Sequence, residues 1–457
     1  MASKATQVRQ ENLNPIIKRI AVLCKMTLLS PALIGSGESE NSKRDIYRDA
    51  EENPIIPGTS LAGVLRNALD EEEAAKLFGR LINSRDDASE TSPLWVFDAP
   101  LYNKPSEKPD KTPAEVIVID NVALDENKVA KPEAKFDFEA VECGTCFDLR
   151  LLLFVRNENR DDNLEELLKK LLDNLNSLYV GGKTSRGFGK LKCVSIHRQE
   201  FHNNPDDLEA WMHFKKNDLD LNCYNETINP APPSEAGTIC ATLRLDGSLL
   251  IRNDYSVVGD ENTAHITSTG LPVIYGTSWA GAIRSGLERL LKTKEADFSN
   301  YNNYLNSVFG CSEIDEKTKK QKTHPSKIRI DASYFAQDKR HLTTRVKIDR
   351  WTGGSVERAL FTARPQFGGH ITLTIYYSEK SKPETEAVRQ LLLLALKVID
   401  LGIIAIGGET SIGRGVFKVE EICVDGVPRC KKELFDISNC DLKTILSQKP
   451  KGGAANG

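Results

Sequence analysis

Apolar residues recur at helical spacing over residues 164–178. Seven leucines stand three or four positions apart there: Leu164, Leu167, Leu168, Leu171, Leu172, Leu175 and Leu178. This spacing puts them on one side of a helix, so we predict an amphipathic helix with one buried face. The helix ends at a Gly-Gly pair at 181–182, and the stretch FGKLKCVSI (188–196) predicts a strand after it.

A second helix is predicted closer to the N-terminus, beginning at Thr59 or Ser60, which are both good N-cap residues. Its apolar face is formed by Leu61, Val64, Leu65, Ala68 and Leu69. Strand-like openings precede this region and its counterpart in the second half of the chain, as IAVLCKMTLL (20–29) and TICATLRL (238–245).

The chain is an internal repeat, because five stretches recur in the same order in its two halves. IIPGTSLAGVLR (55–66) returns as VIYGTSWAGAIR (273–284), and GGKTSRGFGKLK (181–192) returns as GGETSIGRGVFK (407–418). Three shorter pairs are ALIG (32–35) with LLIR (249–252), LFG (77–79) with VFG (308–310), and DAPLY (98–102) with DASYF (331–335). We conclude that the chain contains a duplicated domain.

Each copy has the same order of elements: a strand, a polar loop, a GTS turn, a helix, a charged middle, a closing helix, a glycine turn and a strand. This order predicts an α+β fold of the ferredoxin-like type, with helices on one side of an antiparallel sheet. We place the first domain at 15–198, a polar linker with four prolines at 199–236, the second domain at 237–430 and a tail at 431–457. Trp211, Met212 and Phe214 could anchor a short helix within the linker.

Composition indicates a soluble protein of several domains, with 457 residues of which 40% are hydrophobic and 28% charged. The formal net charge of -4 argues against a surface that is basic throughout, but it allows a local basic groove. The first fourteen residues have no apolar core, and the longest apolar run, 391–406, contains Lys397 and Asp400. We therefore expect a cytoplasmic protein without a secretory signal or a membrane partner.

The ten cysteines are scattered, and Cys143 and Cys146 form a lone CxxC motif. A zinc site would need a second pair of ligands at close spacing. Because an alternating apolar stretch follows directly, we interpret this motif as a turn that enters a strand.

The glycine loop after the leucine-rich helix is not a Walker A motif, because position 177 is Ser and the loop precedes a strand instead of a helix. Its glycines, hydroxyls and cations suit phosphate oxygens. The candidate RNA-binding residues are Gly181, Gly182, Lys183, Thr184, Ser185 and Arg186, with Gly407, Gly408 and Arg414 in the second copy. A tight helix–strand turn is the alternative interpretation, and the recurrence of the loop favours a shared role in binding a ligand.

Together these motifs resemble those of the RAMP superfamily, the repeat-associated backbone proteins of CRISPR complexes. IPGTSLAGVLR and GGKTSRGFG are its paired signatures, both are repeated, and 346–361 resembles the central region of type III backbone subunits. The resemblance covers residues 15–197 and 237–425. It implies two fused backbone domains with RRM-like cores and inserted thumb-like hairpins, lined up along a guide RNA. It also implies RNA contacts at Ser60, Arg66, Ser278 and Arg284.

Three positions depart from the family pattern. Ala62 and Ala280 stand where many members have Lys, and Tyr275 replaces the usual Pro. These departures bear on individual guide contacts and leave the predicted fold unchanged.

The middle of the second copy, residues 317–364, is strongly basic, with 13 Lys and Arg against 4 Asp and Glu. Four aromatic residues are interleaved with these cations: Tyr334, Phe335, Trp351 and Phe361. Cations among aromatic rings suit phosphate neutralisation and base stacking, so Arg345, Lys347, Arg350 and Trp351 are further RNA-binding candidates. The bland alternative is a solvated charged face. The corresponding region of the first copy is more acidic.

The resemblance also implies cleavage of target RNA at an aspartate upstream of the GTS turn, where a divalent metal, Mg²⁺, assists attack by the neighbouring 2′-hydroxyl. Asp260 has the family spacing in the second copy and is the candidate metal ligand. In the first copy the nearest equivalent is Asp45, reached by a slip of one or two residues, whereas we interpret Asp49 as structural. Either candidate could instead be a solvated loop carboxylate. His265 and His341 could act as acid or base, although a lone loop histidine usually does neither.

Two functions follow from these observations. The first is a target-RNA endoribonuclease within the backbone of a type III CRISPR complex, with guide RNA, complementary target RNA and other effector subunits as partners. The second is a non-catalytic RNA-binding scaffold of the same complex. An RRM-like protein unrelated to CRISPR is a third option that the repeated signatures disfavour.

Overall fold

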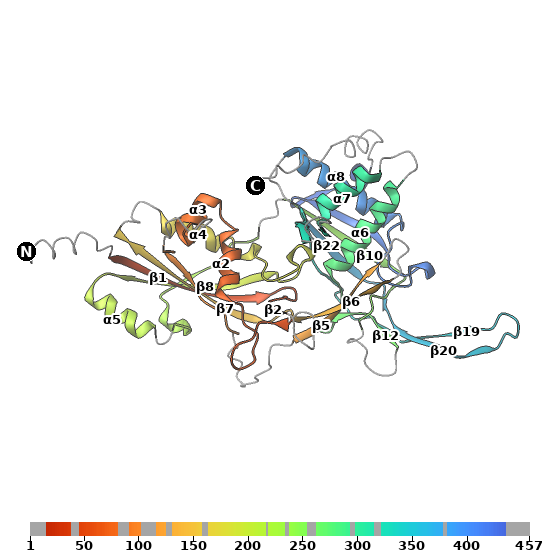
Figure 1. Ribbon diagram of the computed structural model, residues 1–457, viewed down its shortest axis with the longest axis horizontal. Coiled ribbons are helices and arrows are strands. Elements are labelled where there is room, and N and C mark those ends of the chain that lie inside the picture. Colours follow the sequence, from red (N-terminus) through yellow and green to blue (C-terminus); the bar gives the residue numbers. More distant parts are fainter. Residues whose placement is uncertain are drawn as a thin grey trace, which may run out of the picture. The chain divides into compact units, whose positions relative to one another are not determined.

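The computed structural model describes residues 15–37, 45–80, 91–101, 116–124, 130–157, 163–215, 218–233, 237–253, 262–292, 298–314, 321–377 and 382–435. The chain divides into two compact units (Figure 1). Unit 1 comprises residues 1–117, 139–182 and 189–234. Unit 2 comprises residues 118–138, 183–188 and 235–457, so two short segments of the first repeat belong to the second unit.

Unit 1 is built on a five-stranded antiparallel sheet in the order β4-β7-β1-β8-β9. Its strands are β1 (Ile16–Leu28), β4 (Leu94–Val96), β7 (Cys146–Arg156), β8 (Leu191–His202) and β9 (Glu226–Ile228). Alternate residues of β1, from Ile20 to Leu28, face a core shared with the helices α2 (Gly58–Arg66), α3 (Glu71–Phe78) and α4 (Leu164–Asp173). The predicted leucine-rich helix is confirmed as far as Asp173, and all seven leucines of the pattern are buried in this core. Beyond Asp173 the chain forms a 3-10 turn (Leu175–Ser177) and Leu178 is extended, so the helix ends before the Gly-Gly pair.

The helix α2 begins at Gly58, just before the predicted N-cap residues. Pro57 occupies the N-cap position, and no cap side chain satisfies the helix end. Instead Asp98, distant in sequence, accepts a hydrogen bond from the Gly58 N–H at 2.6 Å. A carboxylate at this end also suits the helix dipole.

Unit 2 repeats the topology, with a sheet in the order β17-β22-β10-β23-β24. Its strands are β10 (Thr238–Asp246), β17 (Ile328–Ile330), β22 (His370–Tyr377), β23 (Val416–Val424) and β24 (Val427–Arg429). The helices α6 (Gly276–Leu291), α7 (Phe298–Phe309) and α8 (Lys382–Asp400) contribute to its core, in which Trp279 is fully buried. In each copy the motif strands lie in the spatial order fourth, first, third, second, which is the ferredoxin-like arrangement. The predicted α+β fold with two tandem domains is confirmed.

Each copy carries a hairpin inserted between the second and third strands of this motif. The first consists of β5 (Val116–Leu124) and β6 (Ala130–Val141), and the second of β19 (Thr343–Ile348) and β20 (Ser355–Arg364). Figure 1 shows β19 and β20 running out together from the body of unit 2. We refer to β5–β6 and β19–β20 as the two thumb hairpins.

Short elements complete both units. They are β2 (Gly35–Gly37), β3 (Asp45–Ile46), β11 (Ser248–Leu249), β12 (Thr263–Ala264), β13 (Thr267–Ser268), β14 (Leu271–Ile274), β15 (Cys311–Ile314), β16 (Gln321–His324), β18 (Ser333–Tyr334), β21 (Gln366–Phe367) and α9 (Lys431–Phe435).

Most of the range interpreted as a linker is folded into unit 1. β8 continues to His202, the helix α5 (Pro205–Phe214) follows, and β9 pairs with β8. Phe214 is buried against Phe201, with Trp211 packed beside them, on the sheet face that α2, α3 and α4 leave open. The sequence identified Trp211 and Phe214 as possible anchors of a short helix, but it did not show that Phe201 and Tyr224 of the same polar range pack with them on this sheet face.

Candidate nucleic-acid interface

The two candidate catalytic aspartates lie in the polar loops upstream of the GTS turns. Asp260 is outside the described residues, and Asp45 is the first residue of β3, where its backbone pairs with Gly37 of β2. The neighbouring residues that the structure describes, Asn262 and Ile46, show which strands each loop contacts.

Both polar loops return to the fold at the base of a thumb hairpin. Asn262, two residues after Asp260, donates from its N–H to the Thr362 carbonyl at 3.1 Å and accepts from the Thr362 N–H at 2.9 Å. Thr362 belongs to β20, and β12 pairs with the same strand in parallel. In the first copy the N–H of Ile46, next to Asp45, donates to Glu139 of β6 at 3.4 Å. The residues that flank each candidate aspartate therefore contact the return strand of their own thumb.

Asp49 has a structural role, as the sequence indicated. Its Oδ1 accepts from the N–H groups of Glu51 at 3.0 Å and Asn53 at 2.8 Å, closing the turn that leads into the GTS motif. A carboxylate occupied in this way organises backbone and is not placed for chemistry.

His265 is fully buried, and its Nδ1 accepts a hydrogen bond from the Ile251 N–H at 3.0 Å. Burial, with a smaller contribution from the nearby Arg340, lowers the pKa of His265 to about 3. A ring that stays neutral at physiological pH and has no solvent access packs the base of the loop and does not act as an acid. His341 is exposed.

The tip of the second thumb hairpin presents cations and an aromatic ring to solvent. Lys347 and Arg350 are exposed, and Trp351 is 91% exposed. Asp349 fixes the turn by accepting from the N–H groups of Trp351 and Thr352, and these bonds lower the pKa of its carboxyl. A large ring held in solvent among cations matches the requirements for stacking on unpaired bases.

At the root of the same hairpin, three arginines surround one carboxylate. The carboxylate oxygens of Glu409 form ion pairs with all three. They lie 2.5 Å from a side-chain nitrogen of Arg345 on β19, 3.1 Å from one of Arg252 and 3.3 Å from one of Arg414. Burial alone would raise the pKa of Glu409, but the arginines hold it below its usual range. The structure therefore brings together two predicted residues, Arg345 and Arg414, and two that the sequence did not single out, Arg252 and Glu409. The cluster keeps an excess of two positive charges, and Arg414 is only 6% exposed.

The first copy uses the opposite charge at the aligned position. Lys183 takes the place of Glu409, and its Nζ lies 4.0 Å from the ring centre of Phe138 and 4.6 Å from that of Phe136, both on β6. Both residues have left-handed backbone conformations, with φ of 55° and 58°, and precede matching 3-10 turns. Each glycine loop thus contacts a strand of a thumb through the same position. The signal in the sequence was the Lys-to-Glu reversal between two otherwise similar repeats.

The glycine pairs of these loops approach the chain's own backbone. A side chain at Gly181 or Gly407 would collide with the carbonyl of Leu33 or Leu250, and the next glycine donates to that same carbonyl at 2.7 Å and 2.8 Å. The tight-turn interpretation accounts for these four glycines. Their contact with RNA, like that of the half-buried Thr184 and Ser185, stays a prediction.

The arginines of the GTS helices are engaged within the protein. Arg66 donates from Nη1 to the Gly79 carbonyl at 2.8 Å, and Arg284 donates to the Gly310 carbonyl at 3.2 Å. Arg186 donates from Nη2 to the Phe309 carbonyl at 2.8 Å. Burial, aided by the positive charge of Arg284, lowers the pKa of Arg186. RNA binding by these arginines stays a prediction, as it does for Ser60, which is exposed, and Ser278, which is half-buried.

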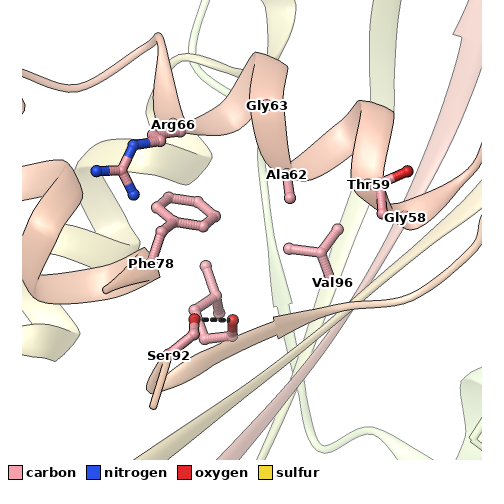
Figure 2. A pocket seen from close by; sticks show the side chains of 9 residues that line it. Gly58, Thr59, Ala62, Gly63, Arg66, Phe78, Ser92 and Val96 are labelled. Carbon is pink, nitrogen blue, oxygen red and sulfur yellow. Dashed lines mark hydrogen bonds between the residues drawn. The ribbon is translucent and has the colours of Figure 1, made fainter. Parts of the chain in front are cut away.

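Beside α2, unit 1 contains a pocket of about 320 Å³ (Figure 2). It is lined by Gly58, Thr59, Ala62, Gly63, Arg66, Phe78, Ser92, Leu94 and Val96. Figure 2 shows Ala62 opposite Val96, with Arg66 and Phe78 at one end and Gly58 at the other.

Within the described part of the chain, no group of three His, Cys, Asp or Glu side chains is placed to hold a metal ion. No disulfide joins cysteines of the described residues, and Cys146 begins β7 directly after a turn at Gly144, so the CxxC motif is a turn entering a strand, as expected. No helix among the described residues has the length and apolar character needed to cross a membrane.

Comparison with known proteins places both copies in one family. The sequence profile of the RAMP superfamily matches residues 25–192 and 242–418. The chain is 27% identical over 198 residues to the CRISPR system Cms endoribonuclease Csm3 of Enterococcus italicus, covering 38% of this chain and 90% of that protein. It is 26% identical over 175 residues to the protein of the same name from Methanocaldococcus jannaschii, covering 33% of this chain and 67% of that protein. With two matched regions, each folded around its own ferredoxin-like sheet, the chain belongs to the RAMP superfamily.

Proposed function

We propose that this chain is a backbone subunit of a type III CRISPR ribonucleoprotein that binds guide RNA and cleaves complementary target RNA at Asp260 and Asp45. The observation that carries the proposal is the repeated junction between the polar loop and the thumb, at Asn262 with Thr362 and at Ile46 with Glu139. The names of the two relatives, both endoribonucleases of a CRISPR system, support the reaction type.

Binding would rely on backbone electrostatics and stacking. The exposed Lys347 and Arg350 can neutralise phosphates, and the Trp351 ring can stack on a base that the hairpin separates from its neighbour. The arginine cluster adds an excess of positive charge at the root of the hairpin whose tip carries these residues. None of these contacts reads a base sequence, which agrees with a role in which pairing to the guide supplies the sequence specificity.

Cleavage would take place where the loop of Asp260 meets the thumb. There an RNA strand held across the hairpin presents a phosphate together with the neighbouring 2′-hydroxyl. In this proposal Asp260 positions that hydroxyl or takes up its proton as the 2′-oxygen attacks the phosphorus. The bond from phosphorus to the 5′-oxygen of the next nucleotide breaks, and the departing 5′-oxygen takes a proton from water. Mg²⁺ binds proteins through one or two carboxylates together with substrate phosphates, so a single loop aspartate suits it as a ligand. The ion, when bound, would stabilise the negative charge that develops on the phosphate.

The experiment that tests the proposal starts from the complex purified from its native cells. RNA that copurifies is sequenced, and a labelled RNA complementary to it is then incubated with the complex, with and without EDTA. The proposal predicts one guide population and cleavage within the paired region that stops on chelation. A non-complementary RNA of the same length is the control and should stay intact.

The second candidate function is a non-catalytic scaffold. It is favoured by the same exposed hairpin, because cations and stacking rings bind RNA without any chemistry. Guide RNA that copurifies without any cleavage of its complement would support this function.

A further inference from the structure

The two glycine loops share a backbone conformation but differ in what covers them. We call residues 183–188 and 409–414 the closing loops of the first and second copies. Gly187 and Gly413 both have positive φ, at 78° and 86°. A Cβ at Gly187 would meet the carbonyl oxygen of Ile330 at 2.5 Å, whereas one at Gly413 would meet nothing within 4 Å.

Within unit 2, the closing loop of the first copy lies on a defined receiving surface. Arg186 donates to the Phe309 carbonyl at 2.8 Å, and the Phe188 ring lies 5.3 Å from the ring of Tyr275. A side chain at Gly276, the first residue of α6, would collide with the carbonyl of Arg186. The receiving surface is therefore the start of α6 together with the end of α7, and glycine permits the contact.

The first copy contains the same receiving surface. By the repeat alignment, Pro57, Gly58 and Phe78 correspond to Tyr275, Gly276 and Phe309. The internal brace is also repeated, because Arg66 binds the Gly79 carbonyl as Arg284 binds that of Gly310. This surface borders the pocket of Figure 2.

Aligned positions show that the receiving surface of the first copy is the less covered one. Ala62 is half-buried where Ala280 is buried. Thr59 and Ser60 are exposed, whereas their counterparts Thr277 and Ser278 are half-buried.

The closing loop of the second copy is more exposed than that of the first copy, just as the receiving surface of the first copy is less covered than that of the second. Ser411, Ile412 and Gly413 are exposed, whereas Ser185 and Arg186 are half-buried and Gly187 is buried. Ile412 is 58% exposed and occupies the position of Arg186. Isoleucine cannot donate to the Phe78 carbonyl, so a second copy of this chain lacks the hydrogen bond that anchors the contact within unit 2.

We propose that the pocket of unit 1 is the docking surface for the closing loop of a different RAMP domain, one that carries arginine at the position of Arg186. Such a contact joins unlike surfaces and extends an array head to tail. The partner's guanidinium would donate to the Phe78 carbonyl, and its glycine would pack against the start of α2. The inference rests on the proposed assembly role and is independent of RNA cleavage.

The test gives this chain the missing donor. Full-length Ile412→Arg is compared with the wild type and with Ile412→Glu after nuclease treatment, by sedimentation equilibrium over a range of concentrations. A charge-assisted hydrogen bond to a carbonyl should tighten self-association about tenfold or more in Ile412→Arg alone. Hydrogen exchange should slow within residues 58–66 as the variant associates.

Substitutions in the pocket decide where the arginine binds. Ala62→Tyr, added to Ile412→Arg, should fill the pocket and return association to the wild-type level. Glu72→Tyr, an exposed position of α3 outside the pocket, should have no effect. Association of Ile412→Arg equal to wild type, or insensitive to Ala62→Tyr, overturns the proposal. A tenfold loss of RNA affinity in Ala62→Tyr, without any effect on association, would instead make the pocket an RNA site.

Discussion

The closing loops of the two copies have the same backbone and opposite charge at the position that contacts a thumb. Lys183 lies over the rings of Phe136 and Phe138, and Glu409 pairs with Arg345. In each copy the loop residue suits the thumb strand that it meets, β6 in the first and β19 in the second, since a lysine next to Arg345 or a glutamate over the phenylalanine rings would be repelled. The duplicated scaffold therefore preserves a contact between loop and thumb, whereas its chemistry differs, and the second copy is left with the more cationic thumb.

The largest expected effect is the loss of stability of unit 2 in acid. His265 in unit 2 is neutral in the folded state, with its pKa lowered to about 3 by burial. The unfolded chain binds a proton below about pH 6.5, so this contribution to stability is complete above pH 6.5 and is lost as pH falls toward 3. We expect the free energy of unfolding of unit 2 to fall by about 3 kcal/mol between pH 7 and pH 4, measured by hydrogen exchange.

The control for this prediction is His265→Gln, which keeps an acceptor for the Ile251 N–H and cannot be protonated. Between pH 4 and pH 6, this variant should take up about one proton fewer on unfolding than the wild type, so its free energy of unfolding should depend less on pH. Equal acid dependence in the two proteins would contradict the role given to His265.

The next largest effect is the loss of protein stability when the charge of Glu409 in the second closing loop is reversed. Glu409→Lys removes the only carboxylate that the described residues place among Arg252, Arg345 and Arg414, and adds a fourth positive charge. Since breaking a partly buried ion pair leaves its partners uncompensated, we expect a loss of about 2 to 3 kcal/mol in denaturant unfolding. Glu421→Lys, at an exposed position of β23, changes the net charge equally and should cost less than about 0.5 kcal/mol.

RNA affinity should separate the two thumbs. Trp351→Ala removes a fully presented ring, and we expect about a tenfold loss of affinity for single-stranded RNA in a filter-binding assay. Phe136→Ala should cost less, because that ring is only 36% exposed and already contacts Lys183. Equal losses in the two variants would show that the thumbs share the RNA contact evenly.

The salt dependence of RNA binding tests the contribution of the second thumb's cations. Replacing Lys347 and Arg350 together by alanine should lower the slope of log affinity against log salt by about 1.4, as expected for two phosphate contacts to a single strand. An unchanged slope would remove these two cations from the interface.

The smallest effect is expected at Lys183. Lys183→Met keeps the aliphatic stem over Phe138 and removes the charge. The free energy of unfolding should therefore fall only by the cation–π interaction, about 0.5 to 1 kcal/mol. Lys76→Met, at an exposed position of α3, is the matched control in the same thermal unfolding assay. A loss as large as that of Glu409→Lys would show that the two loops depend equally on charge.

Local patterns in the sequence were enough to predict the main helices and strands and the duplication of the domain. The leucine spacing of α4 and the repeated GTS and glycine motifs depend only on neighbours in the chain. The contacts that were missed join distant segments: Asp98 at the start of α2, Glu409 at the root of the thumb, and Arg186 on the Phe309 carbonyl. Those contacts depend on the three-dimensional arrangement, so spacing along the sequence cannot reveal them. The aromatic residues of α5 were visible, but their burial depends on a sheet face that only the fold creates.

The proposed function places RNA cleavage at the loop of Asp260, at the base of the second thumb. The most direct measurement maps the cleavage products of one labelled complementary RNA with the wild-type complex, Asp260→Asn, Asp45→Asn and the exposed control Asp246→Asn. We expect Asp260→Asn to remove one cleavage position and Asp45→Asn another, displaced along the target, while target binding stays unchanged and Asp246→Asn cuts normally. The same product pattern from all four proteins would contradict it and leave the chain as a scaffold.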